Sequence, residues 1–207
     1  MAISHIAKLF CAGVAMTFAA AVAVAEPVVG KPAPTFEAKT ADGTTLNLES
    51  LRGRTVVLEW TNHECPYVVK HYEKSGNIPK LQKEAAEQGV VWLQVISSAP
   101  GKQGHVDGAT ALKLNEERGA APSGVILDAD GSVGKLYAAQ TSPHLFIINP
   151  QGILEYKGGI DSIKSAKEDD IPKATNYVRE ALNALAAGKK VPHASTAPYG
   201  CSIKYAG

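Results

Sequence analysis

Short apolar runs, each about as long as a buried strand, dominate the middle of this chain. They are rich in valine, isoleucine and leucine, and glycine, proline or polar clusters bound them. Turn sequences at Asp42-Gly43 and at 149–152 place one strand in a hairpin near the N-terminus and two in a hairpin near the C-terminus. The pattern predicts strands over residues 45–48, 55–60, 90–96, 125–127, 145–148 and 153–156.

Helical segments separate these strands. A helix is expected to begin at Pro66 and to expose Lys70, and others are predicted over residues 80–88, 110–118 and 133–139. The last helix has apolar residues at three- and four-residue steps over 174–185, with Asp170 as its capping residue and Gly188 at its end. Strands that alternate with helices, closed by a hairpin and a helix, indicate an α/β sandwich with a mixed sheet.

The first 25 residues are predicted to be a cleavable signal peptide. Lys8 precedes an apolar run, and Ala23-Val24-Ala25 fits the small-residue pattern of a cleavage site. A retained membrane anchor is the alternative, but the apolar run is short and rich in small residues. We therefore expect one domain over 26–190, a tail over 191–207, and a periplasmic location without stable membrane insertion after cleavage.

Charge and cysteine content narrow the range of possible functions. The 207 residues include 21 Lys+Arg against 20 Asp+Glu, and removal of Lys8 leaves a neutral chain, which gives no indication of a nucleic-acid partner. The mature chain keeps two cysteines, Cys65 and Cys201, in a compartment that permits disulfides. Cys65 follows a predicted strand and precedes Pro66, so it lies where a helix begins, and a helix N-terminus favours a thiolate. The alternative is a buried structural thiol.

Several motifs occur in an order that resembles the thioredoxin-fold superfamily, and within it the peroxiredoxin-like redoxins of the AhpC/TSA type. The resemblance extends over residues 30–187 and includes the entry segment 30–36, the strand 56–60 followed by Cys65-Pro66, the segment 141–148 and the turn 149–152. It implies a thioredoxin-like three-layer sandwich with a mixed central sheet and an N-terminal β-hairpin extension. It also implies that Pro143 is cis and faces the active cysteine.

Two departures separate this chain from the better-known members. Val68 stands where thioredoxins have their second cysteine, and Asn62 stands where typical peroxiredoxins have Thr or Ser. The ending around Tyr199-Gly200-Cys201 resembles a subgroup of periplasmic redoxins, which implies that Cys201 replaces the missing partner. A permanent structural bridge between Cys65 and Cys201 stays open as an alternative to a reversible one.

The resemblance implies an exported thiol oxidoreductase, with Cys65, Cys201, Glu59 and Pro143 as its site residues. Cys65 would attack a peroxide or a protein disulfide, Cys201 would resolve the intermediate, and a thiol reductant would restore both; no cofactor or metal is assigned. Glu59 is at the position of the buried carboxylate of thioredoxins, where it could exchange a proton with a thiol. The alternatives are a copper-binding module that uses Cys65 with His63 and His144, and a redox-inert scaffold.

Overall fold

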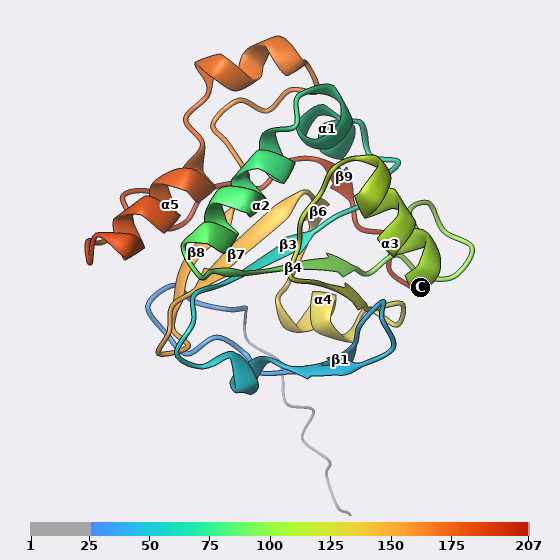
Figure 1. The fold of residues 1–207 in the computed structure, drawn as a ribbon, viewed down its shortest axis with the longest axis horizontal. Helices are drawn as coiled ribbons and strands as arrows, with labels where there is room; N and C mark the ends of the chain where they lie inside the picture. Colours follow the sequence, from blue (N-terminus) through green and yellow to red (C-terminus); the bar gives the residue numbers. More distant parts are fainter. Residues whose placement is uncertain (1–25, 207) are drawn as a thin grey trace, which may run out of the picture.

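The computed structural model describes residues 26–206, so the predicted signal peptide lies outside the described residues. A five-stranded sheet in the order β5-β4-β3-β7-β8 forms the centre (Figure 1). β3 is parallel to β4 and antiparallel to β7, so the predicted mixed sheet is confirmed. The strands of this sheet are β3 (Val56–Trp60), β4 (Val91–Ile96), β5 (Gly124–Leu127), β7 (His144–Ile148) and β8 (Leu154–Gly158).

Every residue of β3 is buried, because both faces of the sheet are covered. Val57 belongs to the hydrophobic core beneath the helices, whereas Val56, Leu58 and Trp60 belong to the core on the opposite face. The helices α1 (Pro66–Val69), α2 (Asn77–Glu87), α3 (Gly108–Glu117) and α5 (Tyr177–Ala186) lie on one side of the sheet, and α4 (Ser132–Leu136) lies on the other (Figure 1). The three-layer sandwich is thereby confirmed.

The predicted N-terminal hairpin is also confirmed. It consists of β1 (Glu37–Lys39) and β2 (Thr45–Asn47), and a 3-10 helix, η1 (Leu48–Leu51), follows it. Asp42 closes the turn, since its carboxylate accepts hydrogen bonds from the hydroxyl and the amide of Thr44. These hydrogen bonds, together with one from Thr40, lower the pKa of Asp42 to about 2.

Three local predictions about the helices are wrong. Helix α2 begins at Asn77 rather than at residue 80, because Pro79 fits within a first helical turn. Helix α5 is capped by Asn176, whose side chain accepts from the Arg179 amide, whereas Asp170 lies in a separate 3-10 helix, η3 (Glu168–Lys173). The third error is Lys70, which is fully buried in the π-helical turn η2 (Lys70–Lys74).

The C-terminal tail packs along the domain. Its strand β9 (Cys201–Ser202) pairs antiparallel with β6 (Thr141–Ser142), directly before Pro143 (Figure 1). Beyond this strand, the Lys204 carbonyl accepts from the Ala99 amide, and the Tyr205 hydroxyl donates to the Ala139 carbonyl. The tail therefore reaches the end of β4 and the loop that follows α4.

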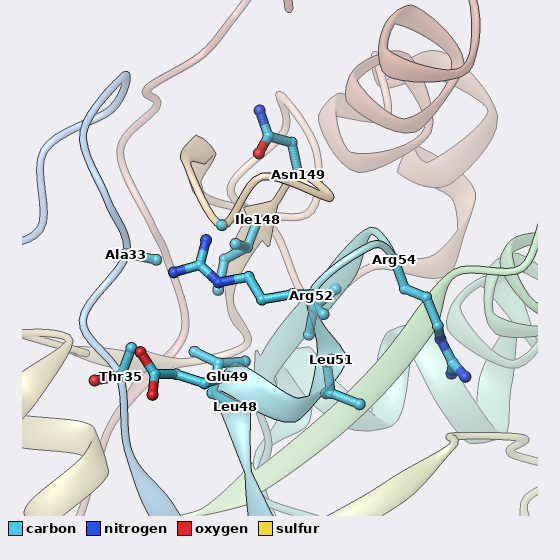
Figure 2. A pocket seen from close by; sticks show the side chains of 11 residues that line it. Ala33, Thr35, Leu48, Glu49, Leu51, Arg52, Arg54, Ile148 and Asn149 are labelled. Carbon is cyan, nitrogen blue, oxygen red and sulfur yellow. The ribbon is translucent and has the colours of Figure 1, made fainter.

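Figure 2 shows a pocket between η1 and the turn that joins β7 to β8. Arg52 extends across it and donates to the Gln151 carbonyl. Its lining includes none of the residues proposed for redox chemistry. This pocket is therefore part of the packing of the loops rather than of the candidate site.

Candidate active site

The loop between β3 and α1 holds Cys65 where the sequence places it. The Asn62 side chain accepts from the Glu64 amide at 3.0 Å, and the Asn62 carbonyl accepts from the Cys65 amide at 3.0 Å, so the turn is closed twice. Cys65 is the N-cap of α1, and Pro66 takes the first helical position, where a missing N–H costs nothing. The predicted placement of Cys65 at a helix N-terminus is confirmed.

A neighbouring loop supports this turn from outside. The Gly104 amide donates to the Glu64 carboxylate at 2.6 Å, and a Cβ at Gly104 would lie 2.3 Å from Cγ of Asn62. Gly104 also has a φ of +83°, which glycine adopts most readily. The glycine-rich segment after β4 thus borders the loop that holds Cys65.

The sulfur of Cys65 is fully buried and has three close contacts. It lies 2.6 Å from Sγ of Cys201, and its thiol donates to the Ser142 carbonyl at 3.1 Å. The Cys201 amide donates to this sulfur at 3.4 Å. The expected amides of α1 do not cap the Cys65 side chain, so the amide that reaches the sulfur comes from the tail.

Cys201 is partly buried, and both thiols are free. Burial, together with the adjacent sulfur of Cys65, raises the pKa of the Cys201 thiol to about 12. Cys201 therefore keeps its proton at neutral pH. The 2.6 Å contact shows that the two cysteines, far apart in sequence, meet in space, as required for either a reversible or a permanent bridge.

The Ser142–Pro143 peptide bond is cis, as the resemblance implies, and Pro143 is buried. Ser142 contacts the site twice: its carbonyl accepts from the Cys65 thiol, and its backbone pairs with Cys201 in β6–β9. The segment before Pro143 thus faces the sulfur, and the tail covers the backbone edge of this segment.

Glu59 is buried, as expected from its position in β3. Its carboxylate accepts from the Tyr72 hydroxyl at 2.7 Å and from Nε1 of Trp92 at 2.7 Å, and Gln82 lies 3.4 Å away. Burial raises the pKa of Glu59, although these hydrogen bonds oppose that shift. No hydrogen bond joins Glu59 to either described cysteine, so proton exchange with Cys65 stays a prediction.

The two histidines of the copper hypothesis do not assemble with Cys65. Among residues 26–206, no three His, Cys, Asp or Glu side chains come close enough to hold a metal ion together. His144 packs against Phe146, with ring centroids 4.5 Å apart, and its Nδ1 accepts from the Gln140 amide. The ligand set His63, Cys65 and His144 is therefore not formed.

Sequence reasoning missed a buried polar cluster beside the tail. Lys70, which was expected on the surface, and His71 are fully buried next to Asp161 and Tyr199. Lys70 directly follows α1 in the chain. The carboxylate that lies beside it belongs to Asp161, in the loop after β8, which is distant in sequence. No local signal identifies Asp161 as the partner of Lys70.

Comparison with known protein families finds a match for most of this chain. The sequence matches the model of the AhpC/TSA family over residues 29–157. Comparison with curated proteins gives no match. In the described part of the chain, no helix combines the length and the apolarity needed to cross a bilayer.

Solved structures give the same fold. An uncharacterized conserved protein from Geobacillus kaustophilus is 26% identical, with 86% of this chain and 93% of that chain covered and a TM-score of 0.74. A hypothetical protein from Sinorhizobium meliloti is 22% identical, with 88% and 97% covered and a TM-score of 0.72. A putative thiol:disulfide interchange protein DsbE from Chlorobium tepidum is 19% identical, with 64% and 85% covered and a TM-score of 0.50. These likenesses show a thioredoxin-like fold.

Proposed function

This chain belongs to the AhpC/TSA family of thioredoxin-fold redoxins, and we propose that it is a thiol-dependent oxidoreductase in which Cys65 attacks and Cys201 resolves. The observation that carries the proposal is the 2.6 Å contact between the two sulfur atoms. A bridge forms only between two sulfur atoms that can approach each other, and in this pair they already do. The family supports a redox function of the thioredoxin type in general.

The pKa of Cys201 supports this division of roles. Because Cys201 holds its proton at neutral pH, it is a poor nucleophile in the resting state. Cys65 is therefore assigned the first attack, and Cys201 acts once the sulfur of Cys65 carries a leaving group. In the resting state the Cys65 thiol donates to the carbonyl of Ser142, and the amide of Cys201 donates to the Cys65 sulfur. The amide of Cys201 can still donate to this sulfur when Cys65 is a thiolate.

Two substrates fit the same pair of steps. With a peroxide, the Cys65 thiolate gives two electrons to the O–O bond, forms a sulfenic acid and releases an alcohol or water after uptake of a proton. Cys201 then attacks the Cys65 sulfur, and its proton leaves with the hydroxyl as water. With a partner disulfide, Cys65 forms a mixed disulfide and releases one thiolate, and Cys201 displaces the second.

Both routes end in a Cys65–Cys201 disulfide that must take two electrons from a thiol reductant. The predicted signal peptide supports a periplasmic location for this cycle, where disulfide exchange is common. The burial of Cys65 adds a condition. A protein disulfide reaches this sulfur only after β9 has left the edge of β6, whereas a peroxide is small enough to need less movement.

Mass spectrometry of the reduced protein tests the proposal. One equivalent of hydrogen peroxide, or of a small disulfide, is added, and the products are mapped in the wild type, Cys65→Ser and Cys201→Ser. We expect a Cys65–Cys201 bridge in the wild type, a trapped Cys65 sulfenic acid or mixed disulfide in Cys201→Ser, and no turnover in Cys65→Ser. Full turnover in Cys65→Ser would refute the assignment, and a bridge that thiol reductants fail to open would favour the redox-inert scaffold.

A further inference from the structure

A buried polar cluster holds the tail two residues before Cys201. Tyr199 is 4% exposed, and its hydroxyl donates to Oδ1 of Asp161 at 2.5 Å. Nζ of Lys70 lies 3.6 Å from Oδ2 of the same carboxylate. The ring of Tyr199 also meets the ring of Tyr67 edge-to-face, with centroids 5.8 Å apart, and Tyr67 lies in the first turn of the helix that Cys65 begins.

Neutral His71, with its proton on Nε2, is the fourth member of the cluster. The Asn77 side-chain amide donates to Nδ1 of His71 at 2.9 Å, so Nε2 carries the proton and donates to the Tyr199 hydroxyl at 3.3 Å. Burial, and then the charge of Lys70, lower the pKa of His71 to about 3, so the ring is neutral. The Tyr199 hydroxyl thus receives one hydrogen bond and gives another, both inside the protein.

Removal of charged side chains from water costs free energy, so stability alone does not account for this cluster. Lys70 is fully buried and Asp161 is 3% exposed, and neither Nζ of Lys70 nor Oδ2 of Asp161 has a hydrogen-bond partner among the described residues. Well-packed apolar side chains would often stabilise a fold equally well. What the charges add is direction, because the carboxylate binds one hydroxyl of the tail in one position.

The geometry between Tyr199 and Cys201 transmits that position to the sulfur. Gly200 joins them with a φ of +143°, and a Cβ there would lie 2.0 Å from the Ser142 carbonyl oxygen. The chain therefore passes the edge of β6 closely and has little freedom between the aromatic ring and the thiol. Cys201 then pairs with Ser142 and directs its amide at the Cys65 sulfur.

We propose that Tyr199, held by Asp161, His71 and Lys70, is the positioning residue for the resolving thiol. This inference rests on the proposed function, since it assigns Cys201 the resolving role. The cluster keeps Cys201 against Cys65, so closure of the bridge is fast and access of bulky reagents to Cys65 is slow. Loss of the Tyr199 hydroxyl slows closure and speeds access, whereas loss of a buried hydroxyl outside the cluster changes neither rate.

Reaction with dithiobis(nitrobenzoic acid), a coloured aromatic disulfide, measures both rates without a choice of natural substrate. The first cysteine to attack forms a mixed disulfide and releases one nitrothiobenzoate; the second cysteine attacks that sulfur and releases another. A Cys11→Ser background leaves only the pair formed by Cys65 and Cys201. The first release reports access, and the second reports closure.

Tyr199→Phe is compared with Tyr137→Phe, which removes a hydroxyl that donates to the Pro34 carbonyl at 2.6 Å in the core on the other face of the sheet. We expect Tyr199→Phe to slow closure about tenfold or more, as for loss of a hydrogen bond to a charged acceptor, and to speed the first release. We expect Tyr137→Phe to change neither rate by more than about twofold, because the hydroxyl that it removes bonds to Pro34 and not to the tail.

The outcomes separate the two proposals. Equal closure rates in Tyr199→Phe and the wild type overturn the positioning role and leave the proposed function intact. A wild-type protein that never releases the second equivalent overturns the proposed function itself. If Tyr199→Phe does not fold, Asp161→Asn tests the same contact from the acceptor side; slower closure supports the proposal, and unchanged closure overturns it.

Discussion

Ser142 and Cys201 are paired residues in the two-stranded β6–β9 sheet, and the carbonyl of Ser142 also accepts from the Cys65 thiol. One backbone unit thus contacts both cysteines. An exposed edge of a strand is a surface where an extended peptide can add as a further strand. In this protein the chain's own tail occupies the edge of β6 and brings its cysteine with it.

Gly200→Ala is expected to displace β9. The new Cβ would lie 2.0 Å from the Ser142 carbonyl oxygen, at a φ of +143° that alanine rarely adopts. We expect faster alkylation of Cys65 and a loss of about 1–3 kcal/mol in the free energy of unfolding. Gly188→Ala is the matched control, because it has a φ of +65° but nothing within 4 Å of the added Cβ. Slow alkylation in both variants would contradict the close approach described for Gly200.

Glu59→Gln is expected to affect stability rather than thiol chemistry. The amide has one acceptor oxygen where the carboxylate has two, so Tyr72 and Trp92 must share that oxygen, and the new NH2 group places a donor where the carboxylate accepts from the Tyr72 hydroxyl. An unpaired buried donor costs about 1–3 kcal/mol. Urea unfolding measures this loss, with the exposed Glu73→Gln as control. We expect the pH profile of Cys65 alkylation to stay in place, since no hydrogen bond joins Glu59 to the sulfur. A shift of this pH profile in Glu59→Gln would support proton exchange between Glu59 and Cys65.

His71 and His144 are expected to make the protein sensitive to acid. Burial lowers the pKa of each to about 3, and the charges of Lys70 and Lys157, respectively, add to the shift. Below the usual pKa of about 6.5 the unfolded chain therefore binds protons that the folded chain does not, so stability falls as pH falls towards 3. Each histidine contributes a slope of about 1.4 kcal/mol per pH unit in that interval.

The measurement is the difference in this slope between the wild type and His144→Gln. Such a difference is needed because burial raises the pKa of Glu59 and of Asp128, and these carboxyl groups favour the folded state as pH falls. We expect His144→Gln to lose one histidine's contribution, whereas His193→Gln, on the surface, serves as control. Identical slopes in the wild type and His144→Gln would show that His144 is protonated in the folded protein.

Local pattern was sufficient for most of the sheet and for the position of Cys65. The apolar run 56–60 predicts β3 because a strand covered on both faces needs apolar residues throughout, and Pro66 marks the helix start. Asp170 was a plausible cap by residue type, but Asn176 is the residue next to the first helical turn. The pattern of apolar and polar residues therefore predicts which segments form helices and strands better than it predicts where they begin and end.

Contacts between distant residues were beyond local pattern. A lysine one turn into a helix is usually solvated, and only the fold reveals that Asp161 lies beside Lys70. The same is true of Tyr199, whose neighbours come from η2 and from the loop after β8. The resemblance suggested that Cys201 pairs with Cys65, but the residues that hold the tail in place required coordinates.

The complete burial of Cys65 beneath β9 has a practical consequence. A reagent too large to enter reacts only during brief local openings, so its rate equals the intrinsic rate multiplied by the fraction of time the strand is away. A series of thiol labels of increasing size would therefore count those excursions directly. The reactivity of the buried Cys65 sulfur therefore reports how often β9 unfolds locally.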